Sequence, residues 1–428
     1  MIRNIHIILR GTMQSVVKVT VIALLFVLMG CEKGPSTDNP IKVGVLHSLT
    51  GTMAISESSV RDATLMAIDE INATGGLLGR MIQPVVADGE SDWPTFAAAA
   101  ERLITQDKVN VIFGCWTSAS RKTVVPILEK HQHLMFYPVQ YEGLEQSPSV
   151  VYTGAAPNQQ IIPAVKWIFD KGLKKVFLVS SDYVFPRAAN EIIKAQVKAL
   201  RGQVVGEEYV LLGSKDVQHM VDEIVKVQPD VILNTINGGT NIAFFEKLRA
   251  AGITPDKIPT MSFSIAEEEL QSMNLKTMAG DYTTWNYFQS VDTKENREFV
   301  NRFKMKYGAS RVTDDPIEAG YFGVYLWAQA VREAGSADVA LVHKTIKNQS
   351  FAAPGGIVTV DSENQHTWKT VRIGKIKDDG QFEIVWSSDR SVRPVPYPIY
   401  KSKTEWGQYI SDLFLSWGKR WANPGNQY

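Results

Sequence analysis

The sequence has little cysteine and no excess of either charge. It contains two cysteines, Cys31 and Cys115, among 428 residues, and its 45 basic residues balance 45 acidic ones. The balanced charge gives no indication of nucleic acid or an anionic membrane surface as a partner. Cys115 belongs to the apolar run 109–115, which predicts a buried structural thiol rather than a nucleophile. A chain of this length can be stabilised by its core without disulfides.

The usual motifs of catalysis are also missing. The sequence contains no His-Glu-x-x-His helix, no Gly-x-Ser-x-Gly turn, no Walker loop and no Cys-x-x-Cys pair. His131 and His133 could ligate a metal from one face of a strand, but no acidic or cysteine cluster accompanies them. We interpret them as part of a solvated turn, and the acidic run 267–269 as a solvated first helical turn that complements the helix dipole. The sequence therefore predicts no enzyme, no cofactor and no metal site.

The N-terminus has the features of an export signal. Basic residues precede the apolar run 19–30, which is too short to span a bilayer as a helix. The run ends at Leu-Met-Gly-Cys (28–31), which resembles the lipobox of bacterial lipoproteins. This resemblance implies cleavage before Cys31 and lipid attachment to it, so we predict a lipoprotein signal peptide over 1–30 and a flexible tether over 31–40. The protein would then be periplasmic or otherwise extracytoplasmic and lipid-anchored to a membrane. The alternatives are an uncleaved anchor and a chance cysteine.

Replacing Cys31 with Ser is expected to abolish lipid attachment and to release the protein from membranes without unfolding it. The reason is that the thiol expected to carry the lipid would be gone. Membrane fractionation and labelling with a fatty acid measure the two effects. Continued acylation of the Cys31→Ser protein would show that the lipoprotein interpretation is wrong.

Short β-branched segments alternate with helical patterns along the rest of the chain, as in βαβ units around parallel sheets. The length, at roughly 100–200 residues per domain, indicates two lobes. Strands are expected at 42–46, 83–87, 109–113, 134–137, 175–179, 204–209, 230–235 and 259–262. Helices are expected over 159–170, 187–200, 217–227, 242–251 and 317–334. Asp92 is expected to cap a further helix, with Pro94 in its first turn.

The loops after the expected strands are the place to look for a ligand. In parallel sheets a ligand binds outside the carboxyl ends of the strands, where loops and helix amino termini present backbone N–H groups. These loops are rich in hydroxyls, amides and aromatic rings and poor in charge, which suits a neutral polar ligand. Each loop alone is also explained by capping and turn chemistry. From these loops we predict Thr117, Asn237 and Ser264 as ligand-binding residues.

Several motifs resemble those of a known family. They include Leu-Thr-Gly (49–51), Gly-Cys-Trp-Thr-Ser (114–118), Tyr-Pro-Val-Gln-Tyr-Glu-Gly (137–143) and Ser-Asp-Tyr-Val-Phe-Pro-Arg (181–187). Together they are similar to the type I periplasmic binding proteins, and the last two blocks resemble the substrate-binding subunits of urea and short-chain amide ABC transporters. The resemblance runs from about 41 to 398. It implies an α/β fold of two doubly wound parallel-sheet lobes joined by a three-strand hinge.

The resemblance also implies a set of ligand-binding residues in the cleft between the lobes. By position these are Trp116, Ser118, Tyr137, Val139, Gln140, Tyr183 and Phe185. Amide-sensing relatives have tyrosine at the Trp116 position, and threonine and proline at those of Val139 and Gln140. These departures put the acetamide pose in doubt and keep the pocket. A ligand with a second amino group in place of a methyl needs one more acceptor, which the side-chain carbonyl of Gln140 could offer.

The same resemblance divides the chain into lobes. Lobe one would comprise 41–156 and 285–351, and lobe two 157–284 and 352–390. Residues 391–428 would form a C-terminal extension whose tryptophans cover a lobe.

The expected function is that of an extracytoplasmic solute-binding lipoprotein of an ABC importer that takes part in nitrogen uptake. Its partners would be urea or a short-chain amide, the permease subunits, and a membrane through the N-terminal lipid. The export signal disfavours a cytoplasmic amide sensor of the same fold. A receptor for a branched-chain or other α-amino acid stays open as the alternative, with Ser118 holding the ligand carboxylate and Glu267 facing its ammonium.

Overall fold

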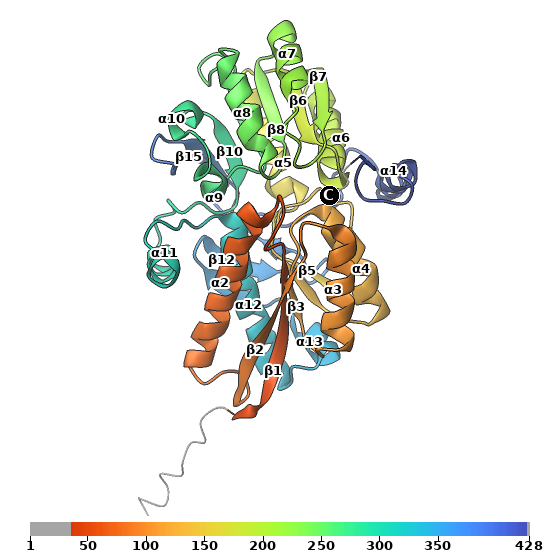
Figure 1. Cartoon of the computed structure of the whole chain (residues 1–428), viewed down its shortest axis with the longest axis vertical. Coiled ribbons are helices and arrows are strands. Elements are labelled where there is room, and N and C mark those ends of the chain that lie inside the picture. Colours follow the sequence, from red (N-terminus) through yellow and green to blue (C-terminus); the bar gives the residue numbers. More distant parts are fainter. Residues whose placement is uncertain (1–35, 426–428) are drawn as a thin grey trace, which may run out of the picture.

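The computed structural model describes residues 36–425, which form two lobes, one above the other in Figure 1. Each lobe has a central sheet flanked by helices, so the expected α/β architecture of two parallel-sheet lobes is confirmed. Within the described range, no helix combines the length and the apolar character needed to cross a bilayer. The expected signal peptide, Cys31 and the first part of the tether lie outside the described residues.

Lobe one is built on a five-stranded parallel sheet in the order β2-β1-β3-β4-β5. Its strands are β1 (Ser36–His47), β2 (Arg80–Asp88), β3 (Ile112–Gly114), β4 (Met135–Tyr137) and β5 (Val150–Tyr152). Its helices are α2 (Ala54–Ala73), α3 (Trp93–Thr105), α4 (Ser118–Lys130), α11 (Lys294–Tyr307), α12 (Asp315–Ala334) and α13 (Val339–Thr345). Because β1 begins at Ser36, which pairs with Arg80, part of the segment expected as a tether belongs to a strand.

Lobe two is built on a seven-stranded sheet in the order β15-β14-β10-β9-β8-β6-β7. Its strands are β6 (Lys175–Ser181), β7 (Gln203–Val210), β8 (Val231–Thr235), β9 (Thr260–Ser262), β10 (Tyr282–Trp285), β14 (Arg372–Ile376) and β15 (Phe382–Ser387). Its helices are α5 (Ile161–Asp170), α6 (Val184–Ala199), α7 (Gln218–Val227), α8 (Thr240–Ala250), α9 (Glu267–Leu270) and α10 (Leu275–Met278). Strands β6 to β10 run parallel, and β14 and β15 add an antiparallel edge next to β10.

A third, antiparallel sheet corrects one of the expected lobe boundaries. It consists of β11 (Ser350–Ala353), β12 (Gly356–Val360) and β13 (Thr367–Trp368), most of which the sequence placed in lobe two. The sheet packs on lobe one instead. Tyr152 at the end of β5 donates its N–H to Gln365 O at 2.9 Å, and its ring stacks on His366 at 4.1 Å. The last crossing into lobe two therefore follows β13, and the other boundaries stay predictions.

Local sequence signals start the elements that carry the candidate site. Asp92 accepts a hydrogen bond from Thr95 N at 2.9 Å and caps α3, with Pro94 in the first turn, as predicted. Gly114 ends β3 where a Cβ would lie 2.1 Å from Leu46 O, so only glycine permits the close contact with β1.

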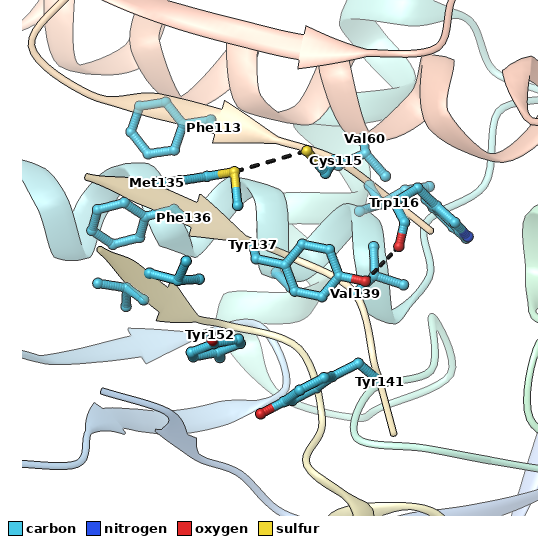
Figure 2. Close-up of a cluster of buried hydrophobic side chains, with 14 of the residues drawn as sticks. Val60, Phe113, Cys115, Trp116, Met135, Phe136, Tyr137, Val139, Tyr141 and Tyr152 are labelled. Atoms are coloured by element: carbon cyan, nitrogen blue, oxygen red, sulfur yellow. Dashed lines mark hydrogen bonds between the residues drawn. The ribbon is translucent and has the colours of Figure 1, made fainter. Parts of the chain in front are cut away.

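A buried cluster of large side chains supports the carboxyl ends of the lobe-one strands (Figure 2). It contains Phe113, Phe136, Tyr137 and Tyr152 from β3, β4 and β5. Cys115 lies in the same cluster with its Sγ 3.8 Å from Met135 Sδ. Burial raises the pKa of its thiol, as expected for a structural thiol rather than a nucleophile. The core therefore fixes the base of the loops that follow these strands.

Candidate functional site

The loops at the carboxyl ends of the strands meet where the two lobes touch. Gln140, after β4 of lobe one, donates its side-chain N–H to Phe263 O, after β9 of lobe two, at 2.9 Å. Gly238 of lobe two also lies close to Met53 of lobe one, beside α2. A Cβ added at Gly238 would be 3.2 Å from Met53 Sδ. We call the region where these loops meet the interlobe site.

Two side-chain amides come together at the interlobe site. Gln160 donates to the same carbonyl as Gln140, Phe263 O, at 3.2 Å, and also to Thr284 O at 2.8 Å. The Oε1 atoms of Gln140 and Gln160 are buried and have no hydrogen-bond partner among the described residues. A buried acceptor without a partner costs about 1–3 kcal/mol, so this pair is suited to a ligand that brings N–H donors.

The sequence missed Gln160. It directly follows Ala-Pro-Asn-Gln (156–159), a further block that resembles the type I periplasmic binding proteins, and that neighbourhood was the available signal.

The predicted residues at the start of α4 are largely engaged within the protein. Thr117 is the helix cap, accepting from Ser120 N at 3.0 Å, and Trp93 Nε1 donates to its hydroxyl at 3.1 Å. The Trp116 carbonyl accepts a 2.5 Å bond from the Tyr137 hydroxyl, which is drawn in Figure 2. These contacts fix the loop backbone, so Thr117 and Tyr137 support the site rather than offer free hydroxyls.

Ser118 belongs to a buried ion network. Its Oγ donates to Glu142 Oε2 at 2.5 Å and accepts from Arg121 Nη1 at 3.0 Å. Arg121 also pairs with Glu142 and Glu145, and Lys122 pairs with Glu145 at 2.8 Å. Burial alone would lower the pKa of Arg121, but the two carboxylates raise it well above its usual range. Two cations face two anions, so this wall is neutral as a whole.

Ser118→Ala is expected to lower the free energy of unfolding by about 1–3 kcal/mol, because Glu142 Oε2 would lose its buried donor. A hydroxyl that faced only the ligand could be removed with little change in the free energy of unfolding of the ligand-free protein. Unfolding in guanidinium chloride measures the effect. Ser290→Ala, at an exposed serine, is the matched control. Equal stability of the two variants would contradict the network role.

The predicted residues of lobe two are linked loop to loop. Ser264 donates its hydroxyl to Ile236 O, and the neighbouring Asn237 donates its N–H to Ser181 Oγ at 3.0 Å. The rings of Tyr183 and Phe185 lie 6.3 Å apart just beyond Ser181. A continuous chain of contacts therefore joins three loops of lobe two.

All ten predicted ligand-binding residues are buried, and the structure divides them into two groups. The lobe-one group contains Trp116, Thr117, Ser118, Tyr137, Val139 and Gln140, and the lobe-two group contains Tyr183, Phe185, Asn237 and Ser264. Gln140 links the groups through its bond to Phe263 O, next to Ser264.

The prediction for the acidic run 267–269 is wrong. Glu267 is 0% and Glu269 4% exposed, because α9 is pressed against α2 of the opposite lobe. Ser56 donates to Glu269 at 2.6 Å and Ser59 to Glu268 at 2.8 Å across the lobe boundary. Burial raises the pKa of Glu267 to about 8 and that of Glu269 to about 7.

The two histidines considered as metal ligands lie away from the interlobe site. His131 Nε2 is 2.9 Å from Glu101 Oε1, and His133 Nε2 is 2.8 Å from Val109 O. His133 is buried, which corrects the expectation of a solvated turn at that position. Over residues 36–425, no three His, Cys, Asp or Glu side chains are grouped so that they could hold a metal ion.

The fold and the paired lobes agree with what comparison with known proteins finds. The model of a family described as "Periplasmic binding protein domain" matches residues 41–403. The chain belongs to this family, which consists of solute-binding proteins and not of enzymes.

Among curated proteins, similarity extends over most of the chain. The Leu/Ile/Val-binding protein homolog 6 of Brucella melitensis is 24% identical over 80% of this chain and 89% of its own length. The leucine-, isoleucine-, valine-, threonine- and alanine-binding protein of Pseudomonas aeruginosa is 24% identical over 76% and 86%. A short stretch is 37% identical to a protein named limonene hydroxylase from Geobacillus stearothermophilus, but it spans 23% of that protein and 29% of this chain.

Solved structures show the same fold. A solute-binding protein of an ABC transporter from Rhodopseudomonas palustris, in complex with 3,4-dihydroxybenzoic acid, has a TM-score of 0.75 at 22% identity, over 83% of this chain and 99% of that one. A branched-chain amino acid transporter substrate-binding protein from Streptococcus pneumoniae, in complex with isoleucine, has a TM-score of 0.73 at 21% identity, over 83% and 100%. None of these relatives is named for urea.

Proposed function

We propose that this protein is the extracytoplasmic, lipid-anchored solute-binding component of an ABC importer and that it holds urea or a short-chain amide between its lobes. The observation that carries the choice of ligand is the pair of buried oxygens, Gln140 Oε1 and Gln160 Oε1, which lack a partner in the described part of the chain. Both side chains are anchored on Phe263 O at the junction of the lobes. Urea brings four N–H donors and can satisfy more than one such acceptor.

The charge of the surrounding side chains supports a neutral ligand. The buried cation nearest the predicted loop 116–118 is Arg121, and it is already paired with Glu142 and Glu145. A ligand carboxylate placed beside Ser118 would lie near Glu142 without a cation of its own, which is unfavourable in a buried site. The resemblance of the blocks 137–143 and 181–187 to amide and urea receptors points to the same ligand class.

A branched-chain or other α-amino acid is the second candidate. Two of the relatives described above are named for Leu, Ile and Val, and one solved relative holds isoleucine. Within this chain, Glu267 supports it, because its buried Oε2 has no partner among the described residues and could receive an ammonium group.

A thermal-shift panel of urea, acetamide, formamide, leucine and benzoate tests the proposal, because a ligand that binds only the native state raises the melting temperature. We expect urea or an amide to stabilise the purified protein, and leucine and benzoate to leave it unchanged. Calorimetry with the stabilising compound then gives the stoichiometry, expected to be one per chain. Stabilisation by leucine alone would establish the second candidate and refute the first.

A further inference from the structure

The C-terminal extension returns to the boundary between the lobes. After β15 the chain forms α14 (Lys403–Ser416), which packs on α6 of lobe two and lies beside it in Figure 1. Tyr409 of α14 donates its hydroxyl to Arg187 O at 3.0 Å. The described chain then continues to residue 425, and its end lies at the level where the lobes meet in Figure 1. The prediction that this extension covers a lobe describes α14 but not the residues after it.

Residues 419–423, called the terminal strap below, pair with the segment 181–185 of lobe two, a loop between the end of β6 and the first turn of α6 that carries Tyr183 and Phe185. Val184 donates its N–H to Trp421 O at 3.0 Å, and Asn423 donates its N–H to Asp182 O at 3.1 Å. These bonds form an antiparallel bridge between Tyr183 and Ala422. The side chain of Asn423 also donates to Asp182 Oδ2 at 2.7 Å. The strap thus bonds Asp182 and Val184, the residues on either side of Tyr183.

The terminal strap also reaches lobe one. The Lys122 ammonium of α4 lies 5.0 Å from the centre of the Trp421 ring, and the centre of the Phe414 ring lies 4.3 Å from it. A cavity of about 630 Å³ separates the strap from α3 and α4, and Trp93, Lys122 and Trp421 are among its lining residues. Trp93 in turn bonds the hydroxyl of Thr117. One short segment therefore contacts predicted ligand loops, or their immediate supports, in both lobes.

We propose that the terminal strap is part of the ligand site. In it, Trp421 and Asn423 are positioning residues that hold the segment 181–185 in place and keep the lobes closed around the ligand. The part of the proposal that concerns the ligand rests on the proposed function. The part that concerns how the strap holds the segment 181–185 does not. Without the strap, the loop loses two backbone hydrogen bonds and one side-chain bond, and the closed form loses a cation–ring contact between lobes. Loss of contacts made only in the closed form speeds ligand release more than it slows capture.

The first experiment needs no ligand. Amide hydrogen exchange, resolved to single residues by NMR, is compared between the full chain and a chain that ends after Gly418. We expect much faster exchange at Val184, whose N–H acceptor is removed, and unchanged exchange at Asp182, whose N–H bonds Val210 O at 2.7 Å. Unchanged exchange at Val184 would overturn the proposal. If the shortened chain does not fold, Trp421→Ala and Asn423→Ala in the full chain remove the side-chain contacts that hold the strap. These variants keep the backbone carbonyl of Trp421, so faster exchange at Val184 is expected because the strap detaches more often, and unchanged exchange in both variants would again overturn the proposal.

The second experiment uses whichever compound of the panel binds the unmodified protein. Trp421→Ala is expected to raise the dissociation rate by roughly fivefold or more with a smaller change in the association rate. Trp386→Ala is the matched control, because Trp386 is 37% exposed on the edge strand β15 of lobe two. Equal dissociation rates of the two variants would overturn the closing role. If no panel compound binds the unmodified protein, the choice of ligand fails, while the exchange experiment still decides whether the strap holds the loop.

Discussion

Gln140→Ala is expected to weaken binding of urea by about tenfold or more, a loss of about 1.4 kcal/mol. Two contributions lead to this loss. The variant lacks the side-chain oxygen that has no partner among the described residues and is free to accept a ligand N–H. It also lacks the 2.9 Å bond from Gln140 to Phe263 O, which joins the two lobes. A ligand donor left without an acceptor in a closed site costs about 1–3 kcal/mol, so one missing oxygen is enough.

The small size of urea makes the effect measurable. Urea has four heavy atoms, and the most favourable binding free energy is about −1.5 kcal/mol per atom. The limit for urea is therefore roughly −6 kcal/mol, which corresponds to a dissociation constant on the order of tens of micromolar. A tenfold loss then moves the constant to hundreds of micromolar, within the range of titration calorimetry.

The melting temperature of the ligand-free protein should change little in this variant. Truncation removes a hydrogen bond, but it also removes a buried oxygen without a partner in the described chain, and the two effects offset each other. Gln203→Ala, at an exposed position of β7, is the control for the substitution itself. Binding by Gln140→Ala as tight as that of the control would mean that the ligand lies elsewhere.

The sequence was a good guide to the strands and to the loops after them. Each of the eight expected strands overlaps an observed strand, because β-branched runs between helical patterns are a strong local signal. It missed β5 (Val150–Tyr152). It also missed the antiparallel edge of β14 and β15, which belongs to a part of the chain where strands no longer alternate with helices.

The candidate site was less predictable, because its contacts join residues far apart in the chain. A run of three glutamates at a helix start is usually solvated, and only the approach of Ser56 and Ser59, more than two hundred residues earlier, buries it. Likewise, Ser118 was expected to face the ligand, but Glu142 and Arg121 both engage its hydroxyl. In each case the composition of the loop indicated a polar site, but the sequence did not show which distant residue would bind the side chain.

Glu267→Gln is expected to stabilise the protein at alkaline pH and to have little effect near pH 5. Glu267 is fully buried, its Oε1 accepts from Gln289 N at 2.7 Å, and Glu269 and Asp315 are the carboxylates that add to the effect of burial. Burial and, to a smaller extent, the two carboxylates outweigh the hydrogen bond from Gln289, which lowers the pKa, and raise the pKa of Glu267 from an ordinary 4.5 to about 8 in the folded protein.

The direction of the pH dependence follows from proton binding. Between about pH 4.5 and pH 8 the folded protein holds a proton on Glu267 that the unfolded chain has released. The free energy of unfolding therefore rises as the pH falls through this window. The contribution of Glu267 to it is lost as the pH rises through the folded-state pKa. Above pH 8 the folded state must bury a charge, at a cost on the order of a few kcal/mol for a pKa shift of this size. Glutamine is neutral at every pH and avoids this cost.

Thermal unfolding at pH 5 and pH 9 measures the effect. We expect the Glu267→Gln variant to melt several degrees above the unmodified protein at pH 9, and the two to melt together at pH 5. Glu269, whose pKa is about 7, is present in both proteins, so the difference between them reports Glu267 together with its interaction with Glu269. Glu298→Gln, on the exposed face of α11, is the control and should show no such divergence. A variant that is less stable at pH 9, or a difference that does not depend on pH, would mean that Glu267 is ionised and paired in the folded protein, as a ligand ammonium would require.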